Sequence, residues 1–192
     1  MILVTGATGN IGRHVVTGLL NQGERVRALT LDSSEEAALP NGVEVVTGDM
    51  ADPQVLATAL RDVRRVFLFP VFDVFSQVLA GCVAADVEQV VLLSSAVVTF
   101  PEPGWLGREQ ARLETEVRES GLGWARGSFP VTALSSARAS WSRPGRESLP
   151  AQHDARAPPL RLGAKTRMIG ELRDVLASRA ATKPTPGSGH TS

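Results

Sequence analysis

The segment that decides the fold is MILVTGATGNIGRHVV, residues 1–16. Residues 1–4 are apolar and have the length and composition of a short buried strand. The glycine-rich stretch TGATGNIGR follows, and Val15, Val16 and Leu19 then place apolar side chains at helical spacing until Gly23 ends the pattern. The segment therefore predicts a strand, a tight turn and a helix.

The glycines of this turn, Gly6, Gly9 and Gly12, have the spacing G-x-x-G-x-x-G. Such a turn allows the N-terminal amides of a helix to face a pyrophosphate, and it lets the backbone approach the phosphates without a Cβ between them. Further side chains or amides toward such a ligand would come from Thr8, Asn10 and Ile11. A purely structural turn is the alternative, but the strand before it and the helix after it favour a dinucleotide site.

The overall composition is that of a globular protein. The 192 residues suit one domain, 43% of them are hydrophobic, and the net charge is zero. Cys82 is the only cysteine, so no disulfide or cysteine metal site can form within the chain, and a buried thiol is expected. Because neither a membrane-length apolar run nor a basic leader is present, we expect a cytoplasmic protein with no membrane contact.

Short apolar segments alternate with helical patterns through the first two thirds of the chain. Asp52 and Pro53 give a clear helix start, an N-cap residue followed by proline at the first helical position. Strands are predicted at residues 1–4, 25–31, 43–47, 65–69 and 89–93, helices at 14–22, 53–60, 72–85 and 110–120, and a loop with a short helical turn at 32–40. This order predicts an α/β fold, a Rossmann-like doubly wound parallel sheet whose ligands lie beyond the carboxyl ends of the strands.

The pattern stops near Trp124. Residues 1–124 carry an excess of acidic side chains, whereas residues 125–192 carry an excess of basic ones and 7 of the 12 prolines. We therefore predict an NAD(P)-binding Rossmann-like domain at 1–124 and an irregular basic Pro/Ser/Arg-rich C-terminal segment at 125–192, with one amphipathic helix at 168–176. Two explanations stay open, a truncated or frame-altered substrate region and a divergent basic extension. Without a motif or interleaved aromatic residues, this segment does not favour nucleic-acid binding.

Several segments of residues 1–124 together resemble one family. TGATGNIGR, GDMADPQVLATAL at 48–60, RRVFLFP at 64–70, VVLLSSA at 90–96 and GREQARLETEVRESGLGW at 107–124 are similar to the atypical short-chain dehydrogenases/reductases. Within that class they resemble the NmrA-like NAD(P)-binding proteins and the NAD(P)H:quinone oxidoreductases related to them. The resemblance implies a Rossmann-like fold and a bound NADP or NAD.

The resemblance also implies roles for single residues around the dinucleotide. Asp49 would accept a hydrogen bond from the adenine amino group and Met50 would lie beside the ring, while Phe69 and Pro70 would line the adenosine and its ribose. Ser94 would lie near the nicotinamide. A turn aspartate and a core aromatic residue are the structural alternatives for Asp49 and Phe69.

The choice between NADP and NAD depends on the residues after the second strand. Leu31 stands where NADP-binding members often carry a basic residue that pairs with the 2′-phosphate. Asp32 would instead accept from a 2′-hydroxyl and favour NAD. Arg13 is placed to supply a positive charge from the other side, and together with the resemblance it favours NADP.

The acid–base pair of ordinary short-chain dehydrogenases is missing. These enzymes protonate the substrate with a Tyr-x-x-x-Lys pair, but this sequence has no tyrosine, and its lysines are Lys165 and Lys183. No catalytic residue can be assigned and no metal site is predicted. A quinone can still accept hydride directly and take its proton from water. We therefore predict an NAD(P)-dependent oxidoreductase that reduces a quinone or similar carbonyl acceptor; a non-catalytic NAD(P)-binding redox sensor of the NmrA type is the alternative.

Overall fold

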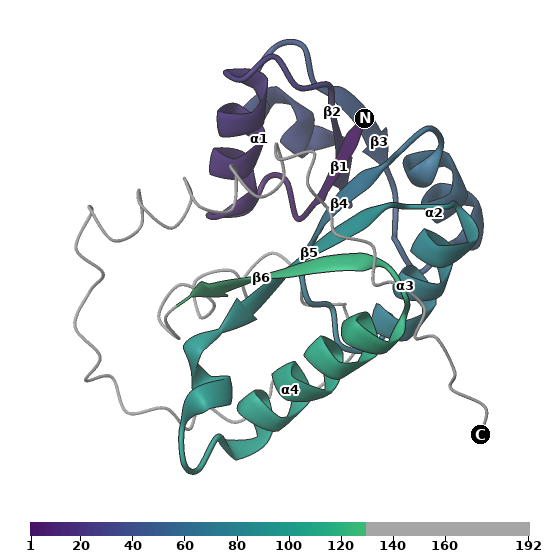
Figure 1. The fold of residues 1–192 in the computed structure, drawn as a ribbon. Helices are drawn as coiled ribbons and strands as arrows, with labels where there is room; N and C mark the ends of the chain where they lie inside the picture. The colour runs from purple at the N-terminus through teal and green to yellow at the C-terminus, as the bar shows by residue number, and fades with distance from the viewer. Residues whose placement is uncertain (130–192) are drawn as a thin grey trace.

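The computed structural model describes residues 1–129 as one α/β unit (Figure 1). Strands alternate with helices along the chain, as the apolar pattern predicts. The elements in order are β1 (Ile2–Thr5), α1 (Gly12–Leu20), β2 (Val26–Thr30), η1 (Ser33–Ala38), β3 (Glu44–Thr47), α2 (Pro53–Leu60), β4 (Arg65–Leu68), α3 (Phe75–Ala84), β5 (Gln89–Ser95), η2 (Ala96–Thr99), α4 (Gly104–Glu119) and β6 (Gly123–Phe129).

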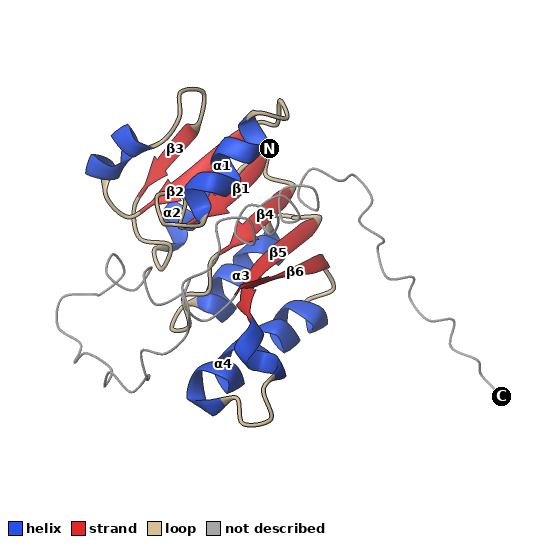
Figure 2. Cartoon of the chain, turned by 90° about the vertical axis from the view of Figure 1, so that its left-hand side faces the viewer, coloured by secondary structure: helices blue, strands red, loops and turns tan. Residues whose placement is uncertain are grey.

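All neighbouring strands pair in parallel, in the order β3-β2-β1-β4-β5-β6 (Figure 2). The order reverses at β1, where the chain first builds outward to β3 and then crosses back to β4. This topology confirms the predicted Rossmann-like doubly wound sheet. It also places the turn after β1 at the switch point, which is where ligands bind in this class of fold.

Strand alternation divides the core into two layers. In β1, Ile2 and Val4 pack with α1, whereas Leu3 packs on the opposite face with the side chains of α2, α3 and α4. All three strand residues are at most 1% exposed. Figure 1 shows α1 on one side of the sheet and α2 and α3 on the other. A sheet covered on both faces explains why these strands are continuously apolar in sequence.

The local start signals act as predicted. The Asp52 carboxylate accepts a hydrogen bond from the Gln54 amide at 2.8 Å, and Pro53 is the first residue of α2. Asp32 caps η1 in the same way, through the Ser34 amide at 2.8 Å. Cys82 is fully buried in α3, as expected, and its burial raises the pKa of the thiol to about 12.

A buried arginine ties the end of α2 to the sheet. Arg27, on β2, is 5% exposed and donates through Nη1 to the carbonyls of Ala59 at 2.8 Å and Arg61 at 2.6 Å. Its Nη2 lies 2.6 Å from a carboxylate oxygen of Glu44 on β3. Arg27 therefore satisfies carbonyls that the end of a helix leaves without partners.

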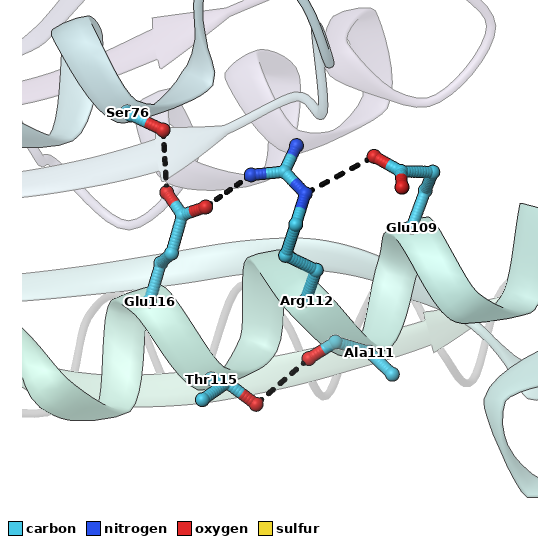
Figure 3. A network of polar contacts seen from close by, with 6 residues as sticks. All are labelled: Ser76, Glu109, Ala111, Arg112, Thr115 and Glu116. Atoms are coloured by element: carbon cyan, nitrogen blue, oxygen red, sulfur yellow. Dashed lines mark hydrogen bonds and ion pairs between the residues drawn. The ribbon is translucent and has the colours of Figure 1, made fainter.

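The outer face of α4 carries an exposed polar network (Figure 3). Arg112 lies between Glu109 and Glu116, forming ion pairs with both. Glu116 in turn accepts a hydrogen bond of 2.7 Å from Ser76 at the start of α3. Exposed ion pairs of this kind each contribute at most about 1 kcal/mol, so the network adds little to stability while it connects α4 to the start of α3.

Two boundaries differ from the prediction. Helix α4 begins at Gly104 rather than at residue 110, because Gly104, with a φ of +60°, makes the turn that brings the helix against η2. Strand β6 runs through Phe129 and so crosses the predicted domain boundary at 124. At the edge of the described sheet, β6 pairs with β5 through its backbone, which does not require the apolar run that the other strands show. The remaining predicted irregular segment, with its helix at 168–176, lies outside the described residues.

Candidate functional site

The turn between β1 and α1 has the geometry that its glycines predict. Gly6 adopts a φ of +61°, and the Gly9 amide donates to the Gly6 carbonyl at 3.1 Å. A Cβ on Gly12 would lie 2.0 Å from that carbonyl oxygen, so only glycine allows α1 to start this close to the turn. The chain therefore reverses within a few residues and delivers the N-terminus of α1 to the carboxyl edge of the sheet.

The start of α1 is open to a ligand. Ile11 occupies the N-cap position and forms no side-chain cap hydrogen bond. Gly9 is half-buried, and a Cβ there would meet only the Gly6 carbonyl oxygen, at 3.2 Å. An uncapped helix N-terminus behind a backbone without side chains is suited to a phosphate group. The residues present thus fit the pyrophosphate of a dinucleotide.

The loop after β4 packs against this turn. The Thr5 hydroxyl donates to the Phe67 carbonyl at 3.2 Å and accepts from the Phe69 amide at 2.7 Å. The Phe69 ring lies against Gly6, where the nearest ring carbon would be 3.2 Å from an added Cβ. Phe69 is half-buried and Pro70 is buried. Phe69 therefore lies beside the glycine turn, and Pro70 follows it in the chain.

The remaining predicted residues differ in how far they are exposed at this edge. Thr8 and Asn10 are half-buried in the turn, and Arg13 is exposed on the first turn of α1. Leu31, directly after β2, is 45% exposed. The side chain of Ile11 is 4% exposed and belongs to the core on the α1 face, so this residue can offer a ligand only its backbone.

The segment after β3 also ends at this edge. The Asp49 carboxylate accepts from the Ala51 amide at 2.8 Å and so closes the turn into α2. Met50 is 3% exposed and packs in the core with the side chains of α2 and α3. Asp49 thus has the structural role that the sequence left open for it, while its predicted contact with adenine stays a prediction, as does that of Met50.

Ser94 turns away from the glycine turn. Its hydroxyl is fully buried and donates to the Glu114 carboxylate on α4 at 2.5 Å. Arg126 on β6 lies 3.4 Å from the other oxygen of Glu114. On β5, Val90 and Leu92 face the same core layer as α4, which explains this orientation. The structure therefore does not bring Ser94 together with the other predicted residues.

Three polar residues were missed by the sequence analysis. Glu35 of η1 accepts hydrogen bonds from Thr8 and Thr30, and Glu114 accepts the Ser94 hydroxyl. Gln110 of α4 is 1% exposed, and its side-chain amide has no partner among the described residues. The acidic residues after β2 were visible in the sequence, but the partners of Glu35 and Glu114 lie 27 and 20 residues away and could not be inferred from it.

Neither a metal site nor a membrane-spanning helix is found in the described part of the chain. No group of three or more His, Cys, Asp or Glu side chains there could hold a metal ion. Within residues 1–129, no helix is long and apolar enough to cross a membrane.

Comparison with known proteins finds a family model that matches the N-terminal part of the chain. Residues 1–88 match the model of the NmrA-like family. The chain is 40% identical over 128 residues to a (4-alkanoyl-5-oxo-2,5-dihydrofuran-3-yl)methyl phosphate reductase of Streptomyces griseus, covering 65% of this chain and 45% of that protein. It is 32% identical over 130 residues to an NAD(P)H azoreductase of Xenophilus azovorans, covering 65% and 46%.

Solved structures show the same fold. An NADPH-dependent quinone oxidoreductase from Escherichia coli is 25% identical, with a TM-score of 0.59 over 66% of this chain and 46% of that one. A triphenylmethane reductase from Citrobacter sp. is 23% identical, with a TM-score of 0.58 over 66% and 48%. The chain thus spans less than half the length of these relatives.

Proposed function

We propose that this chain binds a nicotinamide dinucleotide at the glycine turn and serves hydride transfer to a small-molecule acceptor, a quinone or a similar carbonyl compound. The observation that carries the proposal is the turn itself, in which Gly9 leaves the uncapped start of α1 open at the switch point of the sheet. The similarity to NAD(P)H-dependent reductases supports it.

Different residues would contact different parts of the dinucleotide. The backbone of the turn and the positive end of the α1 dipole hold the pyrophosphate, while Phe69 and Pro70 form an apolar wall beside it. When bound, the reduced nicotinamide supplies the hydride. The chain contains no tyrosine that could act as the acid, so its residues would position the acceptor and leave protonation of the reduced oxygen to water.

A second candidate function is a non-catalytic NAD(P)-binding redox sensor. The burial of Ser94 against Glu114 favours it, because the predicted hydroxyl at the nicotinamide end is already bound within the protein. Both candidates use the same dinucleotide site, and they differ in whether an acceptor is reduced there.

Binding and turnover together test the two candidates. The full chain is titrated with NADH and NADPH, using the fluorescence of the reduced nicotinamide, and oxidation is then followed at 340 nm with a panel of quinones. Binding with turnover supports the reductase, and binding without turnover supports the sensor. If neither NADH nor NADPH binds, both candidate functions are refuted. The Gly9→Val variant should lose binding while its melting temperature without ligand stays near that of the wild type; retained tight binding would place the site elsewhere.

A further inference from the structure

A carboxylate connects the glycine turn to the end of β2. Oε2 of Glu35 accepts a hydrogen bond from the Thr8 hydroxyl at 2.5 Å and another from the Thr30 hydroxyl at 3.1 Å. Thr8 belongs to the turn, and Thr30 is the last residue of β2. Glu35 is half-buried, so the contacts hold its charge beside the turn instead of in open solvent.

The neighbouring acidic residues, Asp32 and Glu36, form hydrogen bonds that do not involve the glycine turn. Asp32 is exposed and caps η1; hydrogen bonds from the backbone and hydroxyl of Ser34 lower the pKa of its carboxyl group. Glu36 is exposed and accepts from the Thr47 hydroxyl on β3 at 2.7 Å. Among the acidic residues of this segment, Glu35 is thus the one whose described contacts reach the turn.

This position corresponds to one part of a bound dinucleotide. In Rossmann folds the adenosine ribose lies at the carboxyl end of the second strand, where an acidic side chain accepts from the 2′-hydroxyl. Both threonines bond to Oε2 of Glu35, and within residues 1–129 no described hydrogen bond uses Oε1. A carboxylate can accept about four hydrogen bonds, so Oε1 is available to ribose hydroxyls.

We propose that Glu35 makes this site select NADH over NADPH, an inference that rests on the proposed function. The 2′-hydroxyl of NADH donates to the carboxylate, whereas the 2′-phosphate of NADPH brings a second negative charge against it. Leu31, directly after β2, is apolar and offers the phosphate no positive charge. This proposal reverses the preference for NADP that Arg13 suggested in the sequence.

Arg13 does not offset the carboxylate in the described structure. It is exposed on the outer side of the first turn of α1, and its described contacts are backbone ones, from its amide to the Gly9 carbonyl and from its own carbonyl to the Thr17 hydroxyl. An exposed charge at this place is screened by solvent and salt. The half-buried Glu35 therefore determines the charge that a 2′-substituent meets.

The test is the ratio of dissociation constants for NADPH and NADH, measured by nicotinamide fluorescence on the full chain. The variant is Glu35→Gln, which keeps the size and an acceptor oxygen but removes the charge. The matched control is Glu36→Gln, which makes the same change in charge one residue away, on a side chain that contacts Thr47 instead of Thr8. Melting temperatures verify that each variant is folded, and Glu35→Ala gives an independent second reading.

We expect the wild type to bind NADH at least about tenfold more tightly, the equivalent of one lost charge-assisted hydrogen bond. Glu35→Gln and Glu35→Ala should each reduce this ratio about fivefold or more, and Glu36→Gln should change it by less than about twofold. Equal or tighter binding of NADPH by the wild type overturns the inference and leaves the proposed function standing, and so does an equal change in both glutamine variants. Failure of the wild type to bind either dinucleotide overturns the proposed function and, with it, the role of Glu35.

Discussion

Replacing Gly12 by alanine should distinguish the packing role of the glycine turn from its binding role. The added Cβ would lie 2.0 Å from the Gly6 carbonyl oxygen, 2.7 Å from the Gly6 carbonyl carbon and 2.8 Å from the Ala7 Cα. All three are backbone atoms, which cannot move aside as the end of a flexible side chain can. The turn or the start of α1 must therefore shift by more than an ångström.

The size of the effect follows from three contributions. Overpacking against fixed atoms costs about 1–3 kcal/mol, and displacement of the Gly6 carbonyl also loses its hydrogen bond from Gly9, which contributes about 1 kcal/mol. Alanine favours a helix over glycine by about 1 kcal/mol, and this offsets part of the loss. The Gly12→Ala variant should therefore lose about 2 kcal/mol in the free energy of unfolding, or about 4–8 °C in melting temperature.

Gly9→Ala is the control for this experiment. Its Cβ would meet only the Gly6 oxygen, at 3.2 Å, so its free energy of unfolding in urea should stay within about 1 kcal/mol of the wild type. Both variants are measured by circular dichroism without ligand. If Gly12→Ala is as stable as Gly9→Ala, the close approach of α1 to the turn is not what requires glycine at position 12.

Three further predictions concern buried groups. Arg27→Met should destabilise the protein by about 3 kcal/mol in urea unfolding because the carbonyls at the end of α2 lose their donor, whereas Glu44→Gln should cost less than about 1 kcal/mol because the Glu44 side chain is 49% exposed. The Cys82 thiol has a pKa of about 12 and should stay unreactive toward a disulfide reagent at pH 8 until denaturant is added; fast labelling of the native protein would contradict its burial. Glu114→Leu should cost about 1–3 kcal/mol by leaving the Ser94 hydroxyl without its acceptor, and adding Ser94→Ala should restore part of that loss; simple additivity of the two changes would argue against the contact.

The parts of the fold that depend on local signals could be predicted from the sequence. The turn between β1 and α1 and the start of α2 at Asp52 and Pro53 each depend on residues within a few positions of one another. Alternating apolar segments then fixed a parallel sheet, because right-handed crossovers leave few other arrangements. Strand β6 was not predicted from the sequence. It lies at the edge of the described sheet, where backbone pairing with β5 is enough to form a strand, even from polar residues such as Arg126 and Ser128.

The side-chain partners at the site could not be predicted in the same way. Ser94 and Glu114 are 20 residues apart, and which face of β5 a serine occupies changes with a shift of one position in the strand. Glu35 lies 27 residues from Thr8, and the direction of its side chain depends on how η1 begins after its N-cap residue, Asp32. Sequence reasoning therefore predicted which edge of the sheet carries the glycine turn, but not which acidic side chain lies beside that turn.

The same long-range contacts prepare the site for its ligand. Thr5 joins β1 to the end of β4 through Phe67 and Phe69, and Phe69 in turn packs on Gly6. A turn held from both sides has already lost the conformational freedom that a mobile loop would lose on binding, and that loss opposes association. Phe69 therefore helps to order the glycine turn, in addition to its predicted contact with the nucleotide. If the proposed site binds a dinucleotide, its backbone is in place before the ligand arrives. Changes at Thr5 should then weaken the binding of NADH and NADPH equally, whereas changes at Glu35 should alter the preference between them.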